Sequence, residues 1–201
     1  MIMRSAFTSG SFNRYGQVLM KNRIKQYIPT LIFMIALIVL DQVTKLIARS
    51  ALADSSVAVI EGVFEFKLVY NTGVAWGMFG QSPVVITLIA LIIMAVVAFV
   101  YFKIPVENKR LRFLRILLIL IFSGAAGNII DRLCVDAVTD FLYFKLINFP
   151  VFNVADIYVT VSGILVAILL IFYYKEEDLD FLKFKRKKNN ESVEQDTTDK
   201  E

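Results

Sequence analysis

The stretch PVVITLIALIIMAVVAFVYF, residues 83–102, decides the fold class of this chain because its twenty residues carry no charge. A helix of this length rises about 30 Å at ~1.5 Å per residue, which matches the hydrocarbon core of a bilayer. The first charge after it is Lys103, where such a helix would reach the membrane surface. The stretch therefore predicts a membrane-spanning helix.

Three further apolar stretches have the length of a crossing. Residues 116–130 and 157–174 carry no charge, and residues 28–40 continue with apolar residues around Asp41 and Lys45. We therefore predict an all-α membrane protein with four transmembrane helices. Their approximate spans are 28–48, 83–103, 113–133 and 153–174.

The composition restricts the chemistry available to such a protein. Hydrophobic residues make up 57% of the 201 residues, histidine is absent and Cys134 is the single cysteine. A disulfide within the chain, a zinc site with the usual ligands and any Ser-His or Cys-His catalytic pair are excluded. Carboxylates are therefore the leading candidates for chemistry, and we expect neither a metal ion nor a cofactor.

The basic residues alternate along the chain in the way that sets membrane topology. Residues 1–27 hold five Lys or Arg, residues 103–115 hold five and the chain after Tyr174 holds seven, whereas 49–82 and 132–152 hold two each. Because cytoplasmic segments carry the excess of basic residues, both termini are predicted to be cytoplasmic. The net charge of +4 is then explained by the membrane, and no nucleic-acid partner is expected.

Three regions follow from this topology. Residues 1–27 form a basic cytoplasmic segment, residues 28–174 form the membrane domain, and residues 175–201 form a charged cytoplasmic tail predicted to be disordered. A cleaved signal peptide is the competing interpretation of the N-terminus, with a small-residue site at 51–53. It is disfavoured because Asp41 and Lys45 lie between the apolar stretch and that site.

The outer segment between the first two helices, about 54–80, is predicted to contain a small extracytoplasmic β segment. Apolar and polar residues alternate over 64–70, which is the period of a half-buried strand. Glu65 and Lys67 would occupy the polar face, and Phe64, Phe66, Leu68 and Tyr70 the apolar face. Residues 74–79, which include Trp76, could then return to the membrane interface.

Polar side chains converge on the outer side of the predicted bundle. They come from four separate parts of the chain: Asp41, Asn71, Asn128, Asp131, Asp140 and Asp156. Carboxylates at membrane depth indicate function, and two neighbouring carboxylates can share a proton for acid–base hydrolysis. The spacing also allows simpler roles, an ion pair between Asp41 and Lys45 and a brace of Asp131 with Arg132 at the end of the third helix. A proton- or cation-coupled carrier and a non-catalytic scaffold remain the alternatives to an enzyme.

Five sequence blocks resemble, in order, those of lipoprotein signal peptidase, also called signal peptidase II. They are DQVTK at 41–45, NTGVAWG at 71–77, GAAGNIIDR at 124–132, VTDF at 138–141 and FNVAD at 152–156. The resemblance implies a membrane aspartic endopeptidase of the bacterial cell membrane. Such an enzyme removes the signal peptide of a diacylglyceryl-modified prolipoprotein by cutting just before the lipidated cysteine. Lipidated prolipoproteins and membrane lipids would be its partners, and we expect a monomer.

The resemblance also assigns site residues. It implies that Asp140 and Asp156 are the catalytic pair, one activating water and the other acting as acid. The positions that it implies bind substrate or support the site are Asp41, Lys45, Asn71, Gly73, Gly124, Asn128, Asp131, Arg132 and Asn153. Two positions depart from the family pattern: Asp136 stands where glycine is expected, and Tyr70 stands where many members have arginine.

Overall fold

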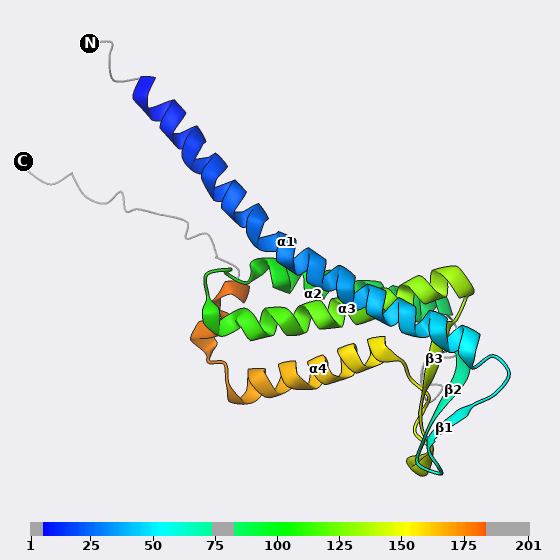
Figure 1. Ribbon diagram of the computed structural model, residues 1–201. Coiled ribbons are helices and arrows are strands. Elements are labelled where there is room, and N and C mark those ends of the chain that lie inside the picture. The colour runs from blue at the N-terminus through cyan, green and yellow to red at the C-terminus, as the bar shows by residue number, and fades with distance from the viewer. Residues whose placement is uncertain (1–5, 74–82, 184–201) are drawn as a thin grey trace, which may run out of the picture.

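A computed structural model describes residues 6–73 and 83–183 of the chain. Its long helices are α1 (Ala6–Ala51), α2 (Pro83–Lys103), α3 (Arg112–Val135) and α4 (Val154–Phe172). Four segments are long and apolar enough to cross a membrane: Tyr27–Ala51, Val84–Lys103, Lys109–Val135 and Val154–Phe172. Helices lie over the four predicted spans, and α1 continues beyond its span as a helix that projects from the bundle (Figure 1).

Helix α3 is the centre of the bundle. It packs against α1, α2 and α4, as Figure 1 shows. In its most apolar window 39% of the residues are buried, against 11% to 17% in the other spans. Small residues in the half of α3 nearer the sheet, among them Gly124 and Gly127, allow the neighbouring helices to approach closely, as is common in membrane bundles.

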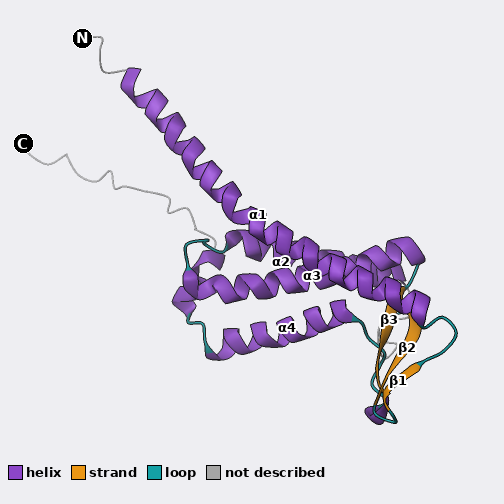
Figure 2. Ribbon diagram, viewed as in Figure 1, coloured by secondary structure: helices purple, strands orange, loops and turns teal. Residues whose placement is uncertain are grey.

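A three-stranded antiparallel sheet lies beyond one end of the bundle (Figure 2). Its strands, in the order β1-β2-β3, are β1 (Val57–Ile60), β2 (Phe64–Asn71) and β3 (Val138–Phe144). The predicted β segment between the first two helices is confirmed, but the sequence did not indicate that its third strand comes from the connection between α3 and α4. This pairing places Asp140 opposite Val69 and brings Asn71 to the same end of the sheet.

The predicted division of β2 into a polar and an apolar face is wrong at both ends. Glu65 is buried and forms an ion pair with Lys145 at 3.1 Å, whereas Tyr70 is 52% exposed. The register against β3 shifts between Phe66 and Val69. Such an irregularity reverses the faces of the residues that follow it, which explains why Tyr70 is exposed. Glu65 precedes the shift, and its burial accompanies the ion pair with Lys145.

The structure differs from the sequence pattern or the sequence predictions at two further places, the end of α3 and the start of the tail. Asp136 ends α3 with φ of 57°, in the left-handed region that favours glycine and that aspartate tolerates, which explains the departure from the family pattern. Residues Glu176–Leu182, expected to belong to a disordered tail, form the short helix η4. The expected return of 74–79 to the interface and the tail after residue 183 lie outside the described residues.

Candidate active site

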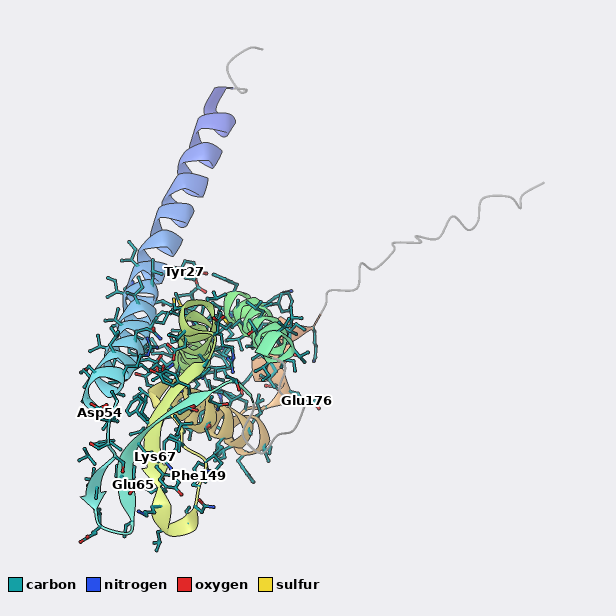
Figure 3. The ribbon with its side chains drawn as sticks, turned by 90° about the vertical axis from the view of Figure 1, so that its right-hand side faces the viewer. Tyr27, Asp54, Glu65, Lys67, Phe149 and Glu176 are labelled. Carbon is teal, nitrogen blue, oxygen red and sulfur yellow. The ribbon has the colours of Figure 1, made fainter. Side chains whose placement is uncertain are left out.

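A cavity of about 440 Å³ lies where the helix bundle meets the sheet. Both Asp140, on β3, and Asp156, in the first turn of α4, line it. Phe149, labelled in Figure 3, lines it from the loop before α4. Four other residues named from the family resemblance also line it: Asn71, Gly73, Asn128 and Arg132.

The Asp140 carboxylate is buried and accepts two amide hydrogen bonds. Its Oδ1 accepts from Asn153 Nδ2 at 2.7 Å, and its Oδ2 accepts from Asn71 Nδ2 at 2.9 Å. Only 2% of the residue is exposed. Burial raises the pKa of Asp140 to about 7, and the charge of nearby Asp156 acts in the same direction, whereas the two amide donors oppose them. Asp140 therefore changes its protonation state near neutral pH.

The Asp156 carboxylate is held by the start of α4. Asn153 is the N-cap residue, and the two residues form a reciprocal capping box in which Asp156 Oδ2 accepts from Asn153 N at 3.0 Å. The other oxygen, Oδ1, accepts from Asn128 Nδ2 of α3 at 2.8 Å. Helix capping thus gives the side chain a fixed direction at the edge of the cavity.

Three asparagine amides have their orientation fixed by a second contact. Asn71 Oδ1 accepts from Gly73 N at 3.0 Å, Asn153 Oδ1 from Asp156 N at 3.0 Å and Asn128 Oδ1 from Lys45 Nζ at 2.9 Å. Because each oxygen already faces a donor, each amide nitrogen must face a carboxylate. The asparagines therefore act as oriented hydrogen-bond donors to the two aspartates.

A buried ionic network that begins on α1 supports the two aspartates and their asparagine partners. Lys45 Nζ lies 2.9 Å from Asp41 Oδ2 and 3.4 Å from Asp131 Oδ2, and all three side chains are fully buried. Asp41 Oδ1 accepts from Ala155 N at 2.9 Å, which ties α1 to the first turn of α4. The ion pair that the spacing of Asp41 and Lys45 allowed is present, but it lies inside the bundle and joins three helices.

Asp131 braces the end of α3, but through partners other than Arg132. Asp131 Oδ1 pairs with Arg49 Nη2 at 2.7 Å, and its Oδ2 accepts from Thr139 N at 2.8 Å. Successive helical residues point about 100° apart, so Arg132 faces the cavity while Asp131 faces α1. In the described part of the chain Arg132 Nε has no hydrogen-bond partner, and Nη1 makes only a 3.5 Å contact with Asn128 O.

The sequence reasoning missed three residues of the site: Arg49, Thr139 and Gly127. Arg49 Nε also donates to Thr139 Oγ1 at 2.8 Å, so Arg49 joins α1, α3 and β3 beside Asp140. Its position four residues after Lys45 was a signal, since it places both cations on one helical face. A Cβ at Gly127 would collide with the Asp41 carboxylate, and nothing in the sequence alone indicated that close approach.

The described residues contain no group of three or more His, Cys, Asp or Glu side chains placed to hold a metal ion. The reactive groups of the cavity are two carboxylates held by amides, at one end of a four-helix membrane bundle. This fold and this site define the class of membrane-embedded aspartic hydrolases.

Comparisons with known proteins identify the family within that class. The signal peptidase (SPase) II family, peptidase family A8, matches residues 33–172. The lipoprotein signal peptidase of Fusobacterium nucleatum is 36% identical over 143 residues, which cover 70% of this chain and 85% of that protein. The lipoprotein signal peptidase of Clostridium novyi is 37% identical over 138 residues, 67% of this chain and 91% of that protein.

A solved structure has a similar fold. It is described as a bacterial membrane enzyme studied by the in meso method, and it is 28% identical with a TM-score of 0.62 over 79% of this chain and 93% of its own. The chain belongs to the signal peptidase II family of aspartic endopeptidases. The predicted family, fold class and enzyme class are thereby confirmed, and the roles of the individual residues remain predictions.

Proposed function

We propose that the chain cleaves the signal peptides of diacylglyceryl-modified prolipoproteins, just before the lipidated cysteine, with Asp140 and Asp156 as its catalytic pair. Lipoprotein signal peptidase activity follows from family membership. The observation that supports the residue assignment is that both carboxylates line one cavity and are oriented by one shared partner, Asn153.

The chemistry requires one carboxylate to act as base and the other as acid. The ionised member takes a proton from the attacking water, while the protonated member polarises the scissile carbonyl and then protonates the leaving amine. The raised pKa of Asp140, near 7, supports a pair that holds one proton at neutral pH. Because the two groups interact, the proton belongs to the pair.

The cavity suits a substrate that arrives within the membrane. Ile86 of α2 and Ile157 and Val161 of α4 give it an apolar wall, which would contact the apolar helix or acyl chains of a lipidated signal peptide. Arg132 lines the same space with an unpaired donor, and this donor would hold a backbone carbonyl of the substrate. Phe149 and Phe152, from the segment before α4, also line this space and would contact the bound segment.

We place the enzyme in the bacterial cell membrane with both termini in the cytoplasm and the cavity on the outer side. Asp140 and the sheet lie at the end of the bundle opposite to the connection between α2 and α3, which carries five basic residues over 103–115. Basic connections remain cytoplasmic, and this supports the orientation. The residues that would support the site from within the bundle are Asp41, Lys45, Gly124 and Asp131. We expect the enzyme to act as a monomer.

Two substitutions test the catalytic pair. Asp140→Asn and Asp156→Asn keep the size of each side chain and remove its titration, so neither purified variant should process a diacylglyceryl prolipoprotein. Asp136→Asn is the matched control, because Asp136 is exposed on the same side of the bundle and Asn tolerates its left-handed backbone. Normal processing by either active-site variant would reject the assignment. Ion flux through liposomes without peptidase activity would instead support a carrier.

A further inference from the structure

A second cavity of about 440 Å³ lies between α1 and α2, with α3 as its floor. It is separate from the aspartate site: Arg115, beside this cavity, and Asn128, beside the aspartates, are thirteen residues apart on α3, or about 20 Å at ~1.5 Å per residue. The walls are apolar side chains of the three helices. Those used below are Leu31 and Met34 of α1, Ala98 and Phe102 of α2, and Leu118 and Phe122 of α3.

This cavity opens sideways from the bundle, and we call it the α1–α2 groove. Helices α1 and α2 both pack against α3. The edges of the groove that face away from α3 are exposed, Leu31 by 50% and Phe102 by 67%. Within a bilayer these edges face lipid. From Tyr27 to Met34 the groove runs about 10 Å along α1, which is most of the roughly 15 Å of hydrocarbon in one leaflet. It therefore has the shape to hold part of an acyl chain.

One end of the groove carries a cation. Arg115 Nη2 donates to Tyr101 Oη at 2.9 Å, the guanidinium lies 5.0 Å from the centre of the Tyr101 ring, and Tyr101 Oη is 3.0 Å from Thr30 Oγ1. Thr30 and Tyr101 both line the groove. Among the described residues Arg115 has no ion pair with a carboxylate, and its buried Nε has no hydrogen-bond partner. A cation so close to the hydrocarbon is costly without a counter-charge.

Aromatic rings mark the same end as the membrane interface. The ring of Phe102 contacts Tyr27 edge-on at 5.8 Å and Tyr101 at 5.6 Å between centroids. Tyrosines gather at the level of the lipid headgroups. Arg115 lies six residues from Lys109, where the span begins, so its long side chain can reach that level.

We propose that the α1–α2 groove binds one acyl chain of an anionic phospholipid whose phosphate pairs with Arg115. The apolar walls supply the contact for the chain. The Arg115 guanidinium, which has no carboxylate partner among the described residues, supplies the charge that an anionic headgroup complements. A zwitterionic lipid would fill the walls equally well but would supply less net charge. The groove should therefore discriminate between lipid headgroups at its Arg115 end, but not between acyl chains along its apolar walls.

Native mass spectrometry of the purified full chain tests this site, with phosphatidylglycerol and phosphatidylcholine of equal chain length as probes. We expect wild-type protein to retain one phosphatidylglycerol at least threefold more often than phosphatidylcholine. Arg115→Gln should bring the two lipids to near parity, and Ala98→Trp, which fills the groove, should lose both. Ile92→Trp is the control, because Ile92 is 64% exposed on α2 and does not line the groove.

Two results would overturn the proposal. One is equal retention of both lipids by wild-type protein, and the other is retention by Ala98→Trp that matches Ile92→Trp. Processing of a lipidated prolipoprotein by each variant shows that it is folded. If Ala98→Trp is unstable, the comparison of Arg115→Gln with wild type still tests whether the lipid phosphate pairs with Arg115.

Discussion

At the scale of single residues, the site depends on how a buried carboxyl titrates. The pKa of Asp140 is raised from 3.8 to about 7 by burial first and by Asp156 second. The folded protein therefore binds a proton between these two pH values that the unfolded chain does not bind. Protonation of Asp140 favours folding fully below pH 4, and this contribution is lost as the pH rises through 7, by roughly 4 kcal/mol at most.

Asp140→Asn removes this dependence. We expect the melting temperature of the variant, relative to wild type, to rise from pH 4 to about pH 7 and then to level off, because over that range the wild-type carboxyl ionises only when the protein unfolds, whereas asparagine does not titrate. Thermal melts of both proteins in the same detergent across this range measure the difference. Asp136→Asn should show no such trend, and a constant gap between Asp140→Asn and wild type would contradict the raised pKa.

Asn71 tunes the same carboxyl. Its amide donates to Asp140 Oδ2 at 2.9 Å and lowers the pKa of Asp140, opposing the effect of burial. Asn71→Ala should therefore raise that pKa further, and the limb of the pH–kcat profile that reports Asp140 should move to higher pH. A profile that only loses amplitude, with its midpoint unchanged, would mean that Asn71 acts on substrate binding instead.

At the scale of elements, the helices approach one another through glycine. A Cβ at Gly124 would lie 2.5 Å from the backbone carbonyl oxygen of Ala155, and a backbone atom cannot move aside as a flexible side chain can. Gly124→Ala should destabilise the protein by about 1–3 kcal/mol and reduce processing, because Ala155 precedes Asp156. Gly163→Ala on α4 is the matched control, since nothing lies within 4 Å of its added Cβ. Equal melting temperatures for the two variants would contradict this packing.

Arg49 links helix α1 to strand β3. It contacts Asp131 at 2.7 Å and Thr139 at 2.8 Å, directly before Asp140 in the chain. Arg49→Gln should therefore lower kcat by ten- to a hundredfold with little change in KM, because small displacements of a reacting group are costly. Lys67→Gln, on the exposed face of β2, serves as the control. A change in KM alone would show that Arg49 does not position Asp140.

The sequence predicted most of the elements but not how distant ones meet. Uncharged length was sufficient for the four spans, because a bilayer sets it, and alternation was sufficient for β2. Strand β3 was missed because seven residues between two helices carry no clear period. The partners of Asp131 were missed because Arg49 is 82 residues away in the sequence and Thr139 lies on strand β3, which was not predicted. The choice between aspartates needed the family blocks rather than spacing.

At the scale of the whole molecule, the proposed orientation can be tested with the one native cysteine. Cys134 is exposed near the end of α3 that borders the sheet, so a membrane-impermeant maleimide should label it from outside intact spheroplasts. In a Cys134→Ser background, Glu177→Cys places a thiol at an exposed position of η4, at the opposite end of the bundle. This second thiol should react only after the membrane is permeabilised. Labelling of Glu177→Cys in intact spheroplasts would reverse the orientation, and it would move the aspartate cavity to the cytoplasmic side, where a signal peptide crossing outward would not present its cleavage site.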